Sequence, residues 1–147
     1  MASRLFDEIR EQRGLAYSVH SIAHAHADVP VLELSAGLDS QKTIEAYRRM
    51  REIVTELREQ GPTAEEVERA RAYAAGARAI SFENSRAVAA HAAQQLIVYR
   101  EDVDPDQAIR LLDEVSYDDV MEAAAFVEDR LAIACVGPHT AEEFELA

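Results

Sequence analysis

The stretch SRLFDEIREQRGLAYSV, residues 3–19, joins an amphipathic helix to a strand through a single glycine. Leu5 and Ile9 recur at helical spacing, so the pattern predicts a helix over residues 4–12. Gly14 is placed to end that helix in a left-handed cap, and a strand is expected to follow. This stretch therefore sets the order helix, turn and strand at the start of the chain.

Two hydrogen-bond donors flank the glycine, Arg13 before it and Tyr17 after it. A guanidinium fork and a phenol can both hold a carbonyl oxygen in the same small volume, which suits gripping a peptide main chain or steadying an oxyanion. A purely structural interpretation is the alternative. In that case Arg13 is a favourable cation in the last helical turn and Tyr17 is an ordinary strand aromatic.

Downstream, residues 15–27 and 31–36 are predicted to pair as antiparallel strands around Asp28-Val29-Pro30. Pro30 marks either an irregular turn or the start of the second strand. A block of capped helices is then predicted: from Asp39-Ser40 to Gly61-Pro62, from Thr63 with Glu66 to about Phe82, from Asn84 or Ser85 through Tyr99, from Asp104-Pro105, and from Ser116.

The apolar run LAIACV, residues 131–136, is predicted to be a central strand buried on both faces. Cys135 within it is then a small buried hydrophobe, and a single cysteine forms no disulfide within one chain. Two strands, a block of helices and one returning strand indicate the α+β class. Helices are expected to cover one face of a small, antiparallel-containing sheet.

Composition favours one soluble domain, since 147 residues with 48% hydrophobic content suffice for one core but not comfortably for two. We place this domain at residues 1–138 and a tail at residues 139–147. The net charge of −13, from 28 acidic against 15 basic residues, argues against nucleic acid and anionic membranes as partners. No run approaches the roughly 18 apolar residues of a membrane span, so a cytosolic location is expected.

Three histidines, His20, His24 and His26, fall on the same face of the first predicted strand. The pair His24-Ala25-His26 has a spacing that can bind a metal. No cysteine joins them. An exposed or peptide-facing strand surface is the alternative interpretation, and residue spacing leaves both open.

The segment SRLFxEIRExRGLAYSV resembles the signature of the C-terminal half of the pitrilysin, insulinase and mitochondrial processing peptidase family of zinc metallopeptidases. Further segments recur in the family's order and at similar intervals: residues 61–70, Ser81-Phe82-Glu83 with Arg86 after it, residues 104–116 and residues 132–138. The resemblance thus covers roughly residues 3–138, nearly the whole chain.

Family members that cut peptides carry His-x-x-Glu-His on a helix, where the histidines bind zinc and the glutamate activates a water. This sequence has no such motif, since residues 20–24, HSIAH, have the wrong spacing and no glutamate. The chain therefore resembles the half without the metal, which contributes an Arg and a Tyr matching Arg13 and Tyr17 to the substrate. The resemblance implies a chain that binds no zinc, is inactive alone, grips an extended peptide and meets zinc in a partner half.

Family members also place a strand, a helix and a Gly-rich turn ahead of the segment that begins at Ser3. The resemblance thus implies a processing-peptidase-like (metallohydrolase-like) domain that lacks its first strand and helix, whether as a truncated gene product, an artificial fragment or one piece of a split protein. Two other functions stay open. In the first, the chain is a catalytically silent scaffold or assembly subunit of the same family. In the second, it is a fragment that self-associates through unpaired strand edges as a homo-oligomer.

Overall fold

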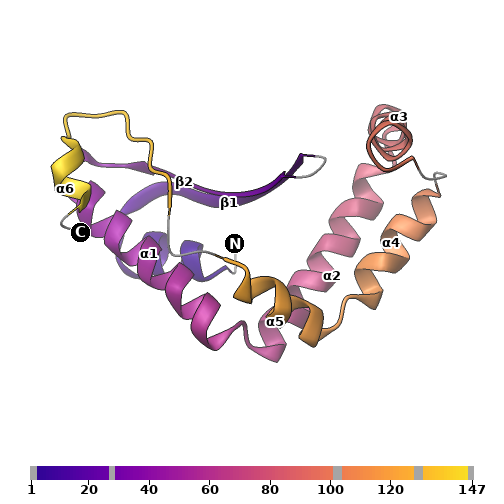
Figure 1. The fold of residues 1–147 in the computed structure, drawn as a ribbon, viewed down its shortest axis with the longest axis horizontal. Coiled ribbons are helices and arrows are strands. Elements are labelled where there is room, and N and C mark those ends of the chain that lie inside the picture. The colour runs from indigo at the N-terminus through magenta and orange to yellow at the C-terminus, as the bar shows by residue number, and fades with distance from the viewer. Residues whose placement is uncertain (1–2, 27–28, 101–103, 128–130, 146–147) are drawn as a thin grey trace. The chain divides into compact units, whose positions relative to one another are not determined.

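The computed structural model in Figure 1 describes residues 3–26, 29–100, 104–127 and 131–145. The chain forms two compact units, one built from residues 1–60 with 127–147 and the other from residues 61–126. Helices and a two-stranded antiparallel sheet make up the described part, so the predicted α+β class is confirmed.

The first unit holds the sheet and the start of the chain. Its elements in chain order are η1 (Phe6–Gln12), β1 (Ala16–His26), β2 (Val29–Leu38), η2 (Ser40–Lys42), α1 (Thr43–Gln60) and α6 (Ala141–Glu145). The helix predicted at residues 4–12 is present, with the wide turns of a π-helix over most of its length. Gly14 follows it with a φ of +58°, the left-handed conformation that favours glycine.

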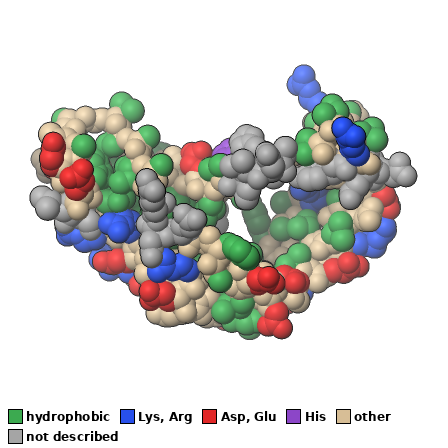
Figure 2. Space-filling model, in the orientation of Figure 1, with side chains coloured by type: hydrophobic (Ala, Val, Ile, Leu, Met, Phe, Trp, Pro, Cys, Tyr) green, Lys and Arg blue, Asp and Glu red, His purple; other side chains and the backbone are tan. Residues whose placement is uncertain are grey.

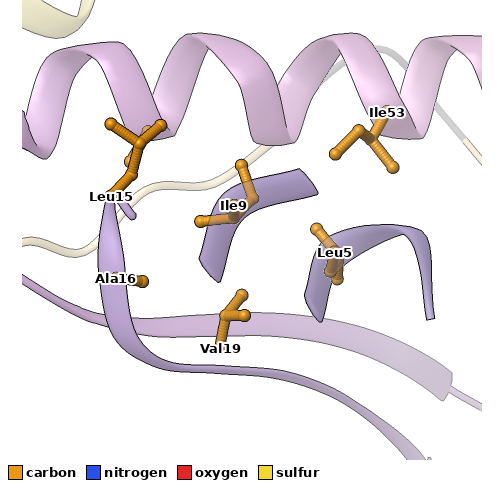
Figure 3. Packing of buried hydrophobic residues seen from close by; sticks show 7 residues of the cluster. Leu5, Ile9, Leu15, Ala16, Val19 and Ile53 are labelled. Carbon is orange, nitrogen blue, oxygen red and sulfur yellow. The ribbon is translucent and has the colours of Figure 1, made fainter. Parts of the chain in front are cut away.

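The core of the first unit forms around η1. Ile9 is completely buried, and the cluster around it includes Leu5, Leu15, Val19 and Ile53. Figure 3 shows η1 between α1 on one side and the strand that carries Val19 on the other. Because η1 is packed on both sides, the turn that follows it starts from a fixed position.

The second unit is helical. Its elements are α2 (Ala64–Ser81), α3 (Ser85–Gln94), η3 (Gln95–Tyr99), α4 (Pro105–Glu114) and α5 (Tyr117–Ala125). Arg71 of α2 donates hydrogen bonds to the carbonyls of Asp113 (3.4 Å) and Val115 (3.0 Å), just where α4 ends. Tyr117 donates its hydroxyl to the carbonyl of Pro62 at 3.0 Å, which ties the start of α5 to the start of α2.

The predicted helix starts are confirmed by their N-cap hydrogen bonds. Asp39, Asn84 and Asp104 each accept a backbone N–H two residues on. Two capping boxes are complete: the side chain of Thr63 pairs with Glu66, and that of Ser116 with Asp119. These contacts satisfy N–H groups that a helix leaves unpaired at its start, which is why the sequence marks each start locally.

Acid should weaken the second capping box. Hydrogen bonds from the Ser116 hydroxyl and then its backbone N–H lower the pKa of Asp119 below its ordinary value of 3.8. A carboxyl whose pKa is lower in the folded state stabilises the fold above its unfolded pKa, and this contribution is lost as the pH falls through the folded pKa. An NMR titration should give Asp119 a midpoint below 3.8, and Ser116→Ala should raise it. A wild-type midpoint at or above 3.8 contradicts this prediction.

The predicted central strand at residues 131–136 is wrong. These residues form no helix or strand and pair with no strand among those described, and Leu131, Ile133 and Val136 are exposed. Cys135 is exposed as well, rather than a buried hydrophobe. Figure 2 shows hydrophobic side chains on the surface along this segment. An apolar run becomes a central strand only when neighbours take its backbone hydrogen bonds, and within the described residues β1 and β2 pair only with each other.

The ends of the predicted elements differ in two places. Residues 141–145, within the expected tail, form α6, and the Phe144 ring meets that of Tyr47 edge to face at 5.4 Å. Pro30 is the second residue of β2, whereas residues 27 and 28 of the predicted turn lie outside the described residues. No described helix is both long and apolar enough to cross a membrane. The cytosolic location stays a prediction.

Candidate functional site

Tyr17 occupies a β-bulge at the start of β1. Ala16 pairs with Leu38 and Ser18 with Gly37, so β1 holds one more residue than β2 at this point, and that residue is Tyr17. The extra residue shifts the alternation of the strand. Tyr17 is 87% exposed, although the residue before it and the second residue after it are buried. Bulges of this kind re-aim a side chain, often beside a functional site.

The neighbouring strand makes room for the bulge. A Cβ on Gly37 would lie 2.9 Å from the Ser18 hydroxyl, closer than real Cβ atoms approach another atom. Glycine at this position therefore allows β2 to come close to the bulged strand. The two residues together position Tyr17 at the surface, on the end of the hairpin that is packed against the core.

Arg10 lies against the ring of Tyr17 and was missed by the sequence-based prediction. Its guanidinium carbon lies 5.9 Å from the centre of the Tyr17 ring and 4.8 Å from that of Phe6. Its Nε is 3.6 Å from a carboxylate oxygen of Glu11. Phe6 and Arg10 are four residues apart in a helix and so share a face, a signal that the sequence offered. A cation within about 6 Å of a ring centre at an exposed site is attracted to it by about 0.5–1 kcal/mol.

Arg13 lies at the C-terminal end of η1, where its backbone N–H donates to the carbonyl of Arg10. It is exposed, and among the described residues its side chain makes no hydrogen bond or ion pair. The structure thus presents Arg13 and Tyr17 from the two sides of Gly14, with Arg10 stacked on Tyr17. The phenol of Tyr17 and the two guanidinium groups are mainly hydrogen-bond donors, and the guanidinium groups are also cations. They therefore suit a ligand that accepts hydrogen bonds, such as a carbonyl or a carboxylate.

A third arginine, Arg49, anchors η1 to α1. Arg49 donates to Glu8 of η1 with Nε at 2.7 Å, and its Nη1 donates at 2.9 Å to both Glu52 and Glu56 of its own helix. The hydrogen bonds to Glu56 and then Glu52 raise the pKa of Arg49 most, burial lowers it, and Glu8 adds a further rise, so the net shift is upward. The guanidinium is therefore charged at every working pH and links the helix that carries Arg10 to α1.

Removing this anchor should loosen the first unit. The Arg49 side chain is only 15% exposed, and Arg49→Met leaves three carboxylates facing one another without their cation. We expect the free energy of unfolding to fall by about 2 kcal/mol. Urea titration read from the amide resonances of the first unit measures it. Arg48→Met, at an exposed position of the same helix, is the control and should change stability by less than about 0.5 kcal/mol. Equal effects of the two substitutions contradict the anchoring role.

The histidine spacing does not produce a metal site among the described residues. No group of three His, Cys, Asp or Glu side chains there could hold a metal. Nε2 of His24 lies 3.4 Å from a carboxylate oxygen of Glu33 on the paired strand, and His20 is exposed. The side chain of His26 lies outside the described residues. Whether the chain binds a metal stays a prediction.

Comparison with known protein families supports the resemblance that the segment of residues 3–19 indicates. Residues 1–73 match the family model described as the Peptidase M16 inactive domain. The match includes η1, the bulged strand, β2 and α1, and therefore every residue of the site above.

Relatives extend the similarity over nearly the whole chain. The Uncharacterized zinc protease SCO5738 of Streptomyces coelicolor is 30% identical over 139 residues, which cover 94% of this chain and 30% of that protein. The Uncharacterized zinc protease YmxG of Bacillus subtilis is 27% identical over 140 residues, 94% of this chain and 34% of that protein. The Uncharacterized zinc protease Rv2782c of Mycobacterium tuberculosis is 26% identical over 140 residues, which cover 95% of this chain and 32% of that protein. The chain thus spans about a third of the length of these relatives.

Proposed function

Because this chain belongs to the M16 peptidase family, we propose that it is the substrate-binding, non-catalytic half of a zinc-dependent endopeptidase that acts on extended peptides. Arg13 and Tyr17 hold the main chain of the peptide, with Arg10 orienting the Tyr17 ring. A partner half supplies the zinc and the base. Hydrolysis belongs to that partner, and this chain contributes binding and orientation.

The observation that carries this proposal is the bulge at Tyr17. A tyrosine ring that is 87% exposed although Ala16 and Val19 on either side are buried in the core, with a guanidinium near its face, is placed for contact with something outside the chain. An extended peptide fits this position because its carbonyls accept from a phenol and a guanidinium. It can also pair with the edge of a two-stranded sheet, where main-chain hydrogen bonds supply affinity without sequence preference.

Direct binding tests the proposal. A fluorescein-labelled, unstructured peptide is titrated with this chain and the anisotropy is followed. The wild type should bind, and Arg13→Met and Tyr17→Phe should each weaken binding roughly fivefold or more, since each removes a donor to the peptide. Tyr73→Phe, at a 76% exposed tyrosine of α2, should bind as the wild type does. Binding that is unaffected by both site substitutions contradicts the proposal.

A scaffold or self-associating fragment is the second candidate, and the exposed apolar segment 131–136 favours it. A second copy that covered this segment or a free sheet edge would remove apolar surface from water. The net charge of −13 opposes such pairing, because two copies repel each other. Sedimentation of the purified chain distinguishes the two: a stable homo-oligomer supports the scaffold, and a monomer that binds peptide supports the peptidase half.

A further inference from the structure

Lys42 is the only lysine among the 15 basic residues of this chain, and it reaches the turn that presents the site. It is the last residue of η2, just before α1. Its Nζ donates a hydrogen bond of 2.9 Å to the carbonyl oxygen of Gly14, 28 residues earlier in the sequence. The contact therefore joins the start of α1 to the residue between Arg13 and Leu15.

The turn is held on its other side by the helix before it. The backbone N–H of Gly14 donates to the carbonyl of Arg10 at 3.1 Å, and that of Leu15 donates to the carbonyl of Ile9 at 2.8 Å. These bonds use the N–H groups of Gly14 and Leu15 but not the carbonyl of Gly14, the residue in the left-handed conformation. Lys42 supplies the donor for that carbonyl, so the turn is held at its amides by η1 and at its carbonyl by η2.

The same residues line a cavity that opens beside Tyr17. Its volume is about 510 Å³, and its walls include Gly14, Tyr17, Leu38, Asp39 and Lys42. Asp39 is engaged as the cap of η2, where its carboxylate accepts the backbone N–H of Gln41. Lys42 therefore lies where a change in its position alters both the turn and the space next to the exposed ring.

We propose that Lys42 is a positioning residue for the peptide-binding site: it holds the Gly14 turn so that Arg13 and Tyr17 are presented in one fixed geometry. The inference rests on the proposed function. A site whose donors are already oriented loses less conformational entropy when a peptide binds, so the tether raises affinity without touching the peptide. A lysine suits this role because a compact ammonium on a flexible stem reaches a single carbonyl oxygen.

The experiment compares Lys42→Met, which keeps the aliphatic stem, with Lys42→Arg, which restores a cationic donor. Amide hydrogen exchange at Leu15 and Ala16 reports the turn, and the anisotropy titration reports peptide affinity. Lys42→Met should speed exchange at these amides severalfold and weaken peptide binding roughly fivefold, while the midpoint of thermal unfolding stays near that of the wild type. Lys42→Arg should recover most of both losses. The Arg48→Met control, which removes one exposed charge from α1, should alter neither.

Different results would overturn the proposed function and the role of Lys42. A wild-type chain that binds no peptide overturns the proposed function itself. Wild-type binding that survives Lys42→Met unchanged overturns the role of Lys42 alone, whatever the exchange rates. Loss of affinity in Lys42→Met without rescue by Lys42→Arg and without faster exchange at Leu15 overturns it too, because the lysine then acts on the peptide rather than on the turn.

Discussion

Replacing Ile9 with alanine should lower the free energy of unfolding of the first unit by about 3 kcal/mol, because Ile9 is the largest completely buried side chain among the residues that the structure describes. Ile9 is completely buried between α1 and the strand that carries Val19 (Figure 3). Ile9→Ala removes apolar area from the core and leaves a cavity that packed neighbours on both sides cannot fill. Urea unfolding, followed by the amide resonances of η1 and β1, measures the loss.

The matched control is the same substitution at an exposed isoleucine. Ile80 of α2 is 69% exposed, so Ile80→Ala should change stability by less than about 0.5 kcal/mol. Because η1 carries Arg10 and leads into the Gly14 turn, Ile9→Ala should also disorder the site. A loss for Ile9→Ala no greater than that for Ile80→Ala would mean that η1 does not form the core described.

Replacing Tyr17 with phenylalanine should lower the kcat/KM for peptide hydrolysis about 100-fold once this chain is combined with a zinc-bearing half. The substitution removes one hydroxyl donor and keeps the ring, its stacking on Arg10 and the bulge. The loss is expected in turnover because an oriented donor is worth most where a carbonyl gains negative charge. Arg13→Met should also lower kcat/KM, because it too removes a donor to the peptide carbonyl.

Two controls separate this role from a structural one. The zinc content of the assembled peptidase should be the same in all variants, since the site residues of this chain lie outside the metal site that the partner is proposed to hold. Tyr73→Phe should leave kcat/KM unchanged. Full turnover in both Tyr17→Phe and Arg13→Met would exclude these side chains from the reaction.

The features that the sequence predicted well are local. The helices α2, α3, α4 and α5 each begin with a capping side chain that lies three residues or fewer from the backbone N–H it accepts, as with Thr63 and Glu66. Gly14 is also predictable, since the left-handed turn that it adopts depends on one residue. Such contacts form within one turn of helix, so a residue pattern specifies them without knowledge of the rest of the fold.

The features that it missed depend on residues far apart. Whether residues 131–136 become a strand depends on a neighbouring strand that the run itself does not contain. The apolar side chains of this run are exposed, although the sequence predicted them to be buried. The contact of Arg10 with Tyr17 depends on the bulge, where β1 and β2 change register between the pairs Ala16–Leu38 and Ser18–Gly37. The bond from Lys42 to Gly14 spans 28 residues and has no local signature.

The measurement that tests the central claim most directly is a pull-down of this chain from lysate of its source organism, with mass spectrometry of every retained protein and a zinc count of the eluate. The account predicts recovery of a protein that carries His-x-x-Glu-His, with one zinc per complex and peptide hydrolysis that Tyr17→Phe reduces. Recovery of this chain alone, without zinc and without hydrolysis, would contradict the account and favour a self-assembled scaffold.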